Sequence, residues 1–146
     1  MRKVQPMSNK NTLAVLLGAD RGKLRLMPTK EIEITRLSEI VGQKVIFTIR
    51  ALNGEEFKEA QEAALSLSKR GEVEDVDSRM LQVMCVINGT QDPNLKDKQL
   101  LDLYDAATPD QLLNGSFLLP GEVSQLFNAI QELSGFGADA VAEVKN

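Results

Sequence analysis

The sequence predicts an α+β protein in which an N-terminal β-hairpin packs on a small, mainly α-helical bundle. Two runs of alternating, β-branched-rich residues lie between residues 30 and 52. The chain that follows has apolar residues at helical spacing, with helix start and stop signals around them. Because its 146 residues are 42% hydrophobic, the chain is large enough for one core, and we expect residues 1–146 to form a single domain.

The chain begins with residues 1–11, whose mostly polar composition predicts a flexible arm. Thr12 is suited to cap a short helix, and Gly18 is suited to end it. Pro28 then interrupts the chain before the first strand.

The β-hairpin is expected over residues 30–52. Its first strand is predicted from alternation over Lys30–Leu37, and its second from alternation over Lys44–Leu52. The connection Ser38–Gln43 is longer than a tight two-residue turn. Since an isolated two-stranded hairpin is marginally stable in water, this hairpin must pack on helices.

Residues 53–135 are expected to be helical. Asn53 with Glu56 three positions later matches a capping box that starts a helix running to about Arg70, before Gly71. The inward-facing positions of this first helix are Phe57, Ala60, Ala64 and Leu67.

Four further helical segments follow the same logic. The second helix carries an apolar series from Val76 to Ile87, and a short third helix is marked by Leu100–Tyr104. Thr108 followed by Pro109 opens a helical turn that ends near Leu113. The last helix is expected from Pro120 to the cap Gly135, before a tail over residues 138–146; its apolar face is Val123, Leu126, Phe127, Ile130 and Leu133.

Composition argues against several classes of partner. The formal net charge of −4 argues against a nucleic-acid-binding surface, which is normally basic. No apolar run approaches the roughly 18 residues of a membrane span, and the N-terminus does not resemble a signal peptide. The single cysteine, Cys85, cannot form a disulfide within the chain, which fits a reducing cytoplasm.

The sequence offers little for catalysis, so we expect no enzymatic activity. Histidine is absent, which removes the commonest general base and the commonest metal ligand. We expect no metal site and no cofactor, because one cysteine cannot build a zinc site and the carboxylates lack calcium-loop spacing. The apolar neighbours of Cys85 favour a buried, unreactive thiol over a nucleophile.

The candidate partner-binding residues are apolar and flank the last helix. Phe117, Leu118 and Leu119 precede it, and Phe136 lies beyond its expected cap. One interpretation is an exposed docking patch for another chain, and the other is a plug of the core. The pattern favours the core for the first three residues and leaves both interpretations open for Phe136.

Four segments of the chain, in this order and spacing, resemble the XkdN-like tail assembly chaperones of phages and defective prophages. They are Pro28–Leu37; Val45–Leu52 leading into Glu55–Phe57; Gly89–Leu95 followed by Leu100 and Leu101; and Leu119–Glu122 followed by Ile130–Gly137. The resemblance covers about Pro28 to Asn146, and the last segment is its most specific part.

The resemblance implies a non-catalytic assembly role in the host cytoplasm. Such chaperones associate with the tape-measure protein, help to recruit tail-tube subunits and are absent from the finished virion. The family also implies a frameshifted longer form of the same chain as a partner, and it has no catalytic residues. The alternative is a structural tail completion or connector protein of the virion. The oligomeric state stays open.

Overall fold

The computed structural model describes residues 11–68 and 78–144. Three parts of the sequence-based predictions lie outside these residues. They are most of the N-terminal arm, the end of the first long helix together with Val76, and the last two residues of the tail. The side chain of Leu67 is also outside the described set.

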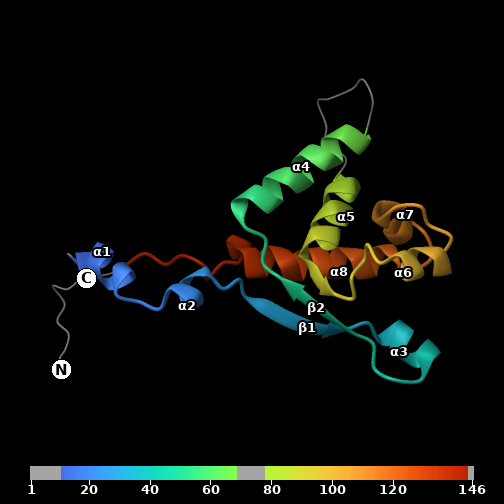
Figure 1. Cartoon of the computed structure of the whole chain (residues 1–146), viewed down its shortest axis with the longest axis horizontal. Coiled ribbons are helices and arrows are strands. Elements are labelled where there is room, and N and C mark those ends of the chain that lie inside the picture. Colours follow the sequence, from blue (N-terminus) through green and yellow to red (C-terminus); the bar gives the residue numbers. More distant parts are fainter. Residues whose placement is uncertain (1–10, 69–77, 145–146) are drawn as a thin grey trace.

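The described residues form an α+β fold with a three-stranded antiparallel sheet in the order β1-β2-β3 (Figure 1), which confirms the predicted fold class. The elements are α1 (Thr12–Leu17), α2 (Arg21–Arg25), β1 (Thr29–Glu33), α3 (Thr35–Val41), β2 (Ile46–Arg50), α4 (Gly54–Ser68), α5 (Ser78–Gly89), β3 (Thr90–Asp92), α6 (Lys98–Leu103), α7 (Pro109–Asn114), α8 (Pro120–Gln131) and the π-helical turn η2 (Glu132–Phe136).

The hairpin strands pair as predicted, with Ile32 opposite Phe47, but the first strand is shorter than expected. The predicted strand over Lys30–Leu37 is wrong in its last half, because β1 ends at Glu33 and Thr35–Val41 form α3. Ile34 and Leu37 are three residues apart, a spacing that puts both on one face of a helix, and both side chains are buried. Gly42 ends α3 in the left-handed conformation, with φ of 86°.

The third strand was not predicted. It begins directly after α5, and Thr90 pairs with Ile49 while Asp92 pairs with Thr48 across an irregular register. Three residues are too few to show an alternating pattern, so the sequence does not reveal this strand. β3 forms by pairing with the edge of β2 that faces away from β1.

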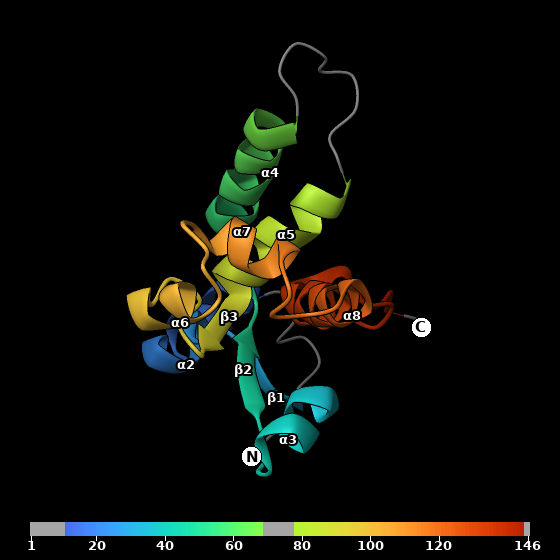
Figure 2. The ribbon, with the colours of Figure 1, turned by 90° about the vertical axis from the view of Figure 1, so that its right-hand side faces the viewer.

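The core lies between the sheet, α5 and α8, and α5 contacts both α4 and α8. Figure 2 shows α4 and α5 rising on one side of the sheet while α8 crosses beside them. The deepest side chains come from β2, α5 and α8, with Phe47, Ile49, Val83, Val86 and Leu126 each at most 1% exposed. The three elements therefore share one aliphatic core, as the composition predicts.

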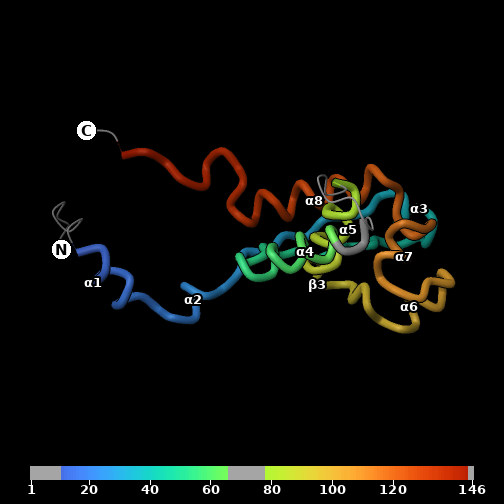
Figure 3. The backbone as a smooth tube through the Cα atoms, turned by 90° about the horizontal axis from the view of Figure 1, so that it is seen from above, coloured from blue at the N-terminus to red at the C-terminus, as the bar shows by residue number. Residues whose placement is uncertain are grey.

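The chain segments at the two described ends leave this core. The tube in Figure 3 shows α1 and α2 at one end of the molecule, with the residues after η2 extending the same way. The predicted helix before Gly18 is confirmed as α1, but Thr12 is its first helical residue and Asn11, not Thr12, is the N-cap residue. The helix α2 was not predicted. Asp20 caps α2 by accepting hydrogen bonds from the backbone N–H groups of Gly22 and Lys23, at 2.8 and 3.3 Å.

Candidate partner-docking surface

The structure separates the four predicted partner-binding residues. Phe117 and Leu118 are in the core, 5% and 1% exposed, and the Phe117 ring lies 5.0 Å from the ring of Tyr104 between centroids. Leu119 is 49% exposed at the start of α8, and Phe136 is 60% exposed just beyond its end. Since a helix rises about 1.5 Å per residue, these two exposed side chains are roughly 25 Å apart and do not share a patch.

The start of α8 is fixed by an ion pair to α3. The Arg36 guanidinium donates to both carboxylate oxygens of Glu122, at 2.9 and 3.0 Å, and to the carbonyl oxygen of Phe117 at 2.9 Å. Glu122 also accepts a hydrogen bond from the backbone N–H of Leu119 at 2.7 Å, which is one half of a capping box. The other half of a capping box is a hydrogen bond from a backbone N–H of the first turn to the N-cap side chain. This bond is missing, because the side chain of Leu119 has no atom that can accept it. This ion pair holds Phe117 in the core and leaves Leu119 outside it.

The end of α8 turns sharply and presents Phe136. Gly135 has φ of 94°, a conformation that non-glycine residues rarely adopt, so the chain turns at the predicted glycine, but the predicted cap is wrong by two residues because Gly137 is the C-cap residue of η2. Phe136 comes back against Phe57 of α4, with ring centroids 5.5 Å apart and planes tilted by 45°. The ring of Phe136 is therefore oriented by one aromatic contact while most of its surface faces solvent.

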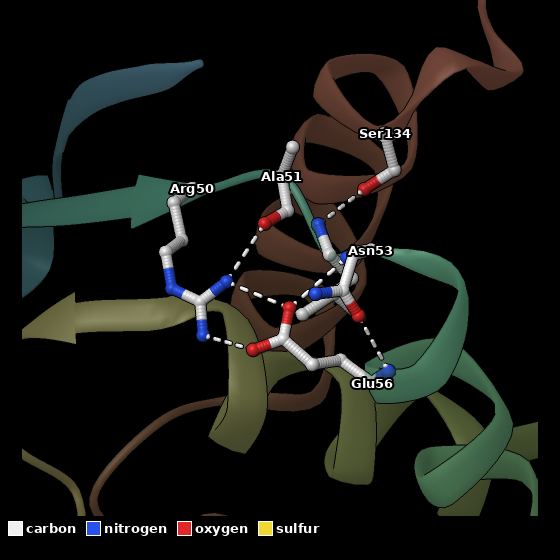
Figure 4. Close-up of polar contacts among 6 residues, drawn as sticks. Arg50, Ala51, Asn53, Glu56 and Ser134 are labelled. Carbon is white, nitrogen blue, oxygen red and sulfur yellow. Dashed lines mark hydrogen bonds and ion pairs between the residues drawn. The ribbon is translucent and has the colours of Figure 1, made fainter. Parts of the chain in front are cut away.

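Ser134 connects this turn to the sheet. Its hydroxyl donates to the carbonyl oxygen of Ile130 at 2.6 Å and accepts from the backbone N–H of Leu52 at 2.9 Å. The residues after β2 are thereby held against the end of α8 (Figure 4). The contact fixes the distance between the start of α4, which carries Phe57, and the turn that carries Phe136.

A polar network at the start of α4 completes the support of Phe57 (Figure 4). Asn53 and Glu56 exchange side-chain-to-backbone hydrogen bonds of 2.8 and 3.0 Å, so the predicted capping box is confirmed. Arg50 binds the Glu56 carboxylate with two nitrogens, at 2.7 and 2.9 Å, and donates to the carbonyl oxygen of Ala51. Phe57 follows Glu56 directly, so its position depends on this network.

A hollow of about 330 Å³ is lined by residues of α8, η2 and the segment after it, among them Leu133 and Gly137, which directly follows Phe136. Lys30 of β1 also lines it. We call Phe57, Phe136 and this hollow the α8-end surface. Sequence reasoning found Phe136 and correctly placed Phe57 on the inward stripe of its helix, where it is partly buried against the core. It missed their contact, because no local pattern shows that two rings distant in sequence will meet.

The two ion pairs make folding sensitive to acid. The hydrogen bond from Arg50 lowers the pKa of Glu56, and the hydrogen bond from Arg36 lowers the pKa of Glu122. Both carboxylates thus bind protons more weakly in the folded chain than in the unfolded chain. Their stabilisation is complete above the unfolded pKa of roughly 4.3 and is lost as the pH falls through the lower folded pKa.

We therefore expect the free energy of unfolding to decrease as the pH is lowered from about 5 to about 2. In the double variant Glu56→Gln with Glu122→Gln, the same change of pH should lower it less, which urea titrations at each pH would measure. Glu62→Gln, an exposed change on α4, is the matched control and should keep the wild-type slope. If the free energy of unfolding of the double variant depended on pH as strongly as that of the wild type, the acid sensitivity would not come from Glu56 and Glu122.

The remaining chemistry of the described residues is sparse. Cys85 is 1% exposed, and burial raises the pKa of its thiol to about 11, as expected for an unreactive core residue. Among residues 11–68 and 78–144, no group of three or more acidic or cysteine side chains is arranged to hold a metal ion. Within the same residues, no helix combines the length and the apolar character that crossing a membrane requires.

Comparison with known proteins identifies the family of this chain. A family model described as Phage XkdN-like tail assembly chaperone protein matches residues 13–145. The Phage-like element PBSX protein XkdN of Bacillus subtilis (strain 168) is 23% identical over 124 residues, which cover 77% of this chain and 84% of that relative.

The fold also has a counterpart among solved structures. The crystal structure of the protein yqbn superposes with a TM-score of 0.58 at 18% sequence identity, covering 82% of this chain and 98% of that one. At this identity the likeness shows the fold alone. The family model, in contrast, spans nearly the whole sequence. The chain therefore belongs to the XkdN-like phage tail assembly chaperones.

Proposed function

We propose that this chain binds the tape-measure protein through the α8-end surface and helps to recruit tail-tube subunits, without catalysing a reaction. The observation that carries the proposal is the exposed ring of Phe136, held by Gly135 and Phe57 and followed directly by Gly137, which lines a hollow. Family membership supports the class of function, and the exposed ring supports this location for the contact.

The chemistry of the α8-end surface suits an apolar helical partner. Aromatic side chains are enriched where proteins bind one another, because a large rigid ring buries much apolar area at little cost in conformational entropy. The hollow accepts an apolar side chain, while Lys30, Glu132 and Asp139 at its lining supply charged groups at the border. A small apolar centre with a charged border supports binding that is specific and still reversible, as a chaperone requires.

A non-catalytic role is supported by the side-chain inventory. The sequence contains no histidine, and its one thiol is buried with a raised pKa. Neither of the two carboxylates with a lowered pKa is a general acid at neutral pH, because each is ionised and occupied by an arginine. Both ion pairs stabilise the fold, and the pair of Arg50 with Glu56 also positions Phe57 of the α8-end surface.

The test is co-expression with the tape-measure protein encoded in the same gene cluster. The wild-type chain should co-purify with it and raise its soluble yield, and Phe136→Ala should reduce capture by at least about tenfold. Because Phe136 is 60% exposed, the variant should lose only the aromatic pair, about 0.5–1.5 kcal/mol of unfolding free energy. Leu103→Ala, an equally exposed change on α6, is the control and should leave capture unchanged.

Two results would count against this function. The first is that neither co-purification nor a higher soluble yield of the tape-measure protein is seen with the wild-type chain. The second is that mass spectrometry of purified mature tails finds the chain in stoichiometric amounts, which would favour the alternative of a structural tail completion or connector protein.

A further inference from the structure

The sheet has an open edge along β1. In the order β1-β2-β3, β1 pairs with β2 on one side, and among residues 11–68 and 78–144 no strand pairs with its other side (Figure 2). An open edge is a template for a further strand, because it presents a row of unpaired backbone N–H and carbonyl groups. Addition of an extended peptide to such an edge is a recurring mode of protein recognition.

The register of β1 shows which of its backbone groups are available. The N–H of Ile34 donates to the carbonyl oxygen of Val45 at 3.0 Å, so Ile34 is a hydrogen-bonded position of the β1–β2 pair. Such positions alternate along an antiparallel pair, and the backbone groups of Thr29, Glu31 and Glu33 therefore point away from β2. These three positions span the whole of β1, a length typical of a strand in a sheet.

A hollow of about 290 Å³ is lined by both β1 and α8. Ile32 lines it from β1, and Gln125 and Leu126 line it from α8. Because side chains alternate along a strand, Ile32 lies on the opposite face of β1 from Glu31 and Glu33. A segment added to β1 would direct every second side chain to the face of Ile32, where the hollow has room for an aliphatic group.

The other face of this edge is acidic. Glu31 is exposed and Glu33 is half-buried, and neither forms an ion pair within the described part of the chain. A residue directly opposite one of them in an added strand lies about 4.5–5.5 Å away between Cβ atoms, close enough for an opposite charge to stabilise the pair. A second copy of β1 would bring its own glutamates to this face, where like charges repel. The edge therefore suits a basic occupant.

We propose that β1 binds an extended segment of a partner protein as a fourth strand, in which apolar side chains alternate with lysine or arginine. The apolar side chains face α8 and enter the hollow, and the basic ones lie opposite Glu31 and Glu33. Backbone hydrogen bonds to β1 hold the segment antiparallel, which is the more stable direction per residue.

The inference names a second surface and does not rest on tape-measure binding. None of the residues that line this hollow lines the hollow of the α8-end surface. The partner is recognised here through its backbone and an alternation of period two, whereas the α8-end surface suits a helical face.

The probe is a blocked peptide of about seven residues in which lysine alternates with valine, titrated into the full chain and followed by NMR. We expect saturable binding with a dissociation constant below about 1 mM. At saturation the amides of Thr29, Glu31 and Glu33 should exchange with solvent at least about tenfold more slowly, because they gain hydrogen bonds. The amides of Lys30 and Ile32 already bond to β2, so they should change little and serve as the internal control.

Matched peptides separate the three contributions to binding. Glutamate in place of lysine, and serine in place of valine, should each raise the dissociation constant at least about tenfold, the first by repulsion and the second by leaving the hollow unfilled. N-methylation of the lysine amides should prevent binding, because residues opposite outward positions direct their N–H groups to β1. N-methylation of the valine amides, which face away, should be tolerated.

Variants of the chain test the same contact from the other side. Glu31→Lys with Glu33→Lys should lose the lysine peptide and bind the glutamate peptide instead. Glu62→Lys with Glu143→Lys changes the total charge equally at exposed positions outside β1, and should bind as the wild type does. Glu31→Pro removes an outward N–H and keeps the pairing with β2, so it should weaken binding at least about tenfold. Phe136→Ala should bind the peptide normally, whatever its effect on tape-measure capture.

Several outcomes would overturn the proposal. Absence of saturable binding excludes the site. Binding without slower exchange at Thr29, Glu31 and Glu33 would mean that the peptide is held by charge elsewhere on the chain. Equal binding of the lysine and glutamate peptides would remove the role of the two glutamates. If these amides exchange slowly in the free chain at every dilution, the chain covers its own edge, and if dilution restores fast exchange, a second copy covers it.

Discussion

Replacing Phe47 by alanine is expected to lower the free energy of unfolding by about 3–5 kcal/mol, the largest stability effect of any change considered for this chain. Phe47 is 1% exposed at the centre of β2, and its ring stacks on that of Phe117 with centroids 6.1 Å apart. Truncation removes the apolar contacts of the ring and leaves a cavity between the sheet and the start of α8 that rigid neighbours cannot fill.

Urea denaturation at one fixed protein concentration would measure this loss, with an unchanged m value showing that only stability has altered. Ile46→Ala is the matched control, since Ile46 is adjacent in the same strand but 38% exposed. Its cost should stay below about 1 kcal/mol. A loss of less than about 1 kcal/mol for Phe47→Ala would mean that β2 does not form the centre of the core.

Replacing Gly89 by valine is expected to destabilise the chain by about 1–3 kcal/mol or more, because the last turn of α5 rests directly on α8. A Cβ atom at this position would lie 2.8 Å from Cδ1, 3.0 Å from Cγ2 and 3.1 Å from Cγ1 of Ile130. Both residues are buried, and Ile130 is 1% exposed. The helix therefore must shift away from α8 or force Ile130 into a poorer rotamer.

A double-mutant cycle with Ile130→Ala would identify this contact as the cause, since removing the crowded atoms should make Gly89→Val less costly by about 0.5–3 kcal/mol. Gly121→Ala is the control, because nothing lies within 4 Å of the corresponding Cβ position on α8. It should be neutral or slightly stabilising, by up to about 1 kcal/mol. Equal costs for Gly89→Val in both backgrounds would contradict the close contact.

The parts of the fold that were predicted correctly are those whose signals are local. The capping box of Asn53 and Glu56 is confirmed because both partners lie within one helical turn. Burial of Phe47 and Ile49 follows from period-two alternation within β2. The start of α7 at Pro109 and the left-handed turn at Gly135 follow from the fixed φ of proline and the free φ of glycine.

The parts that were missed depend on distant neighbours. Thr35–Val41 became helical although Ile32 and Ile34 alternate with polar residues up to the start of this segment, since the choice depends on what each face can pack against. Gly89 was interpreted only as a helix end, and its contact with Ile130 could not be foreseen because α8 lies far along the chain. The pairing of Phe136 with Phe57 is of the same kind.

The sequence by itself determined the class of fold, the order of the main helices and the lack of histidine-based chemistry, because each is a property of composition or short-range spacing. The tertiary structure alone decided that Phe117 and Leu118 are buried while Leu119 and Phe136 are exposed, and that α1 and α2 lie at the opposite end of the molecule from α3. The physical reason is that exposure and proximity are set by which surfaces exclude water together, and this depends on segments that local patterns cannot relate.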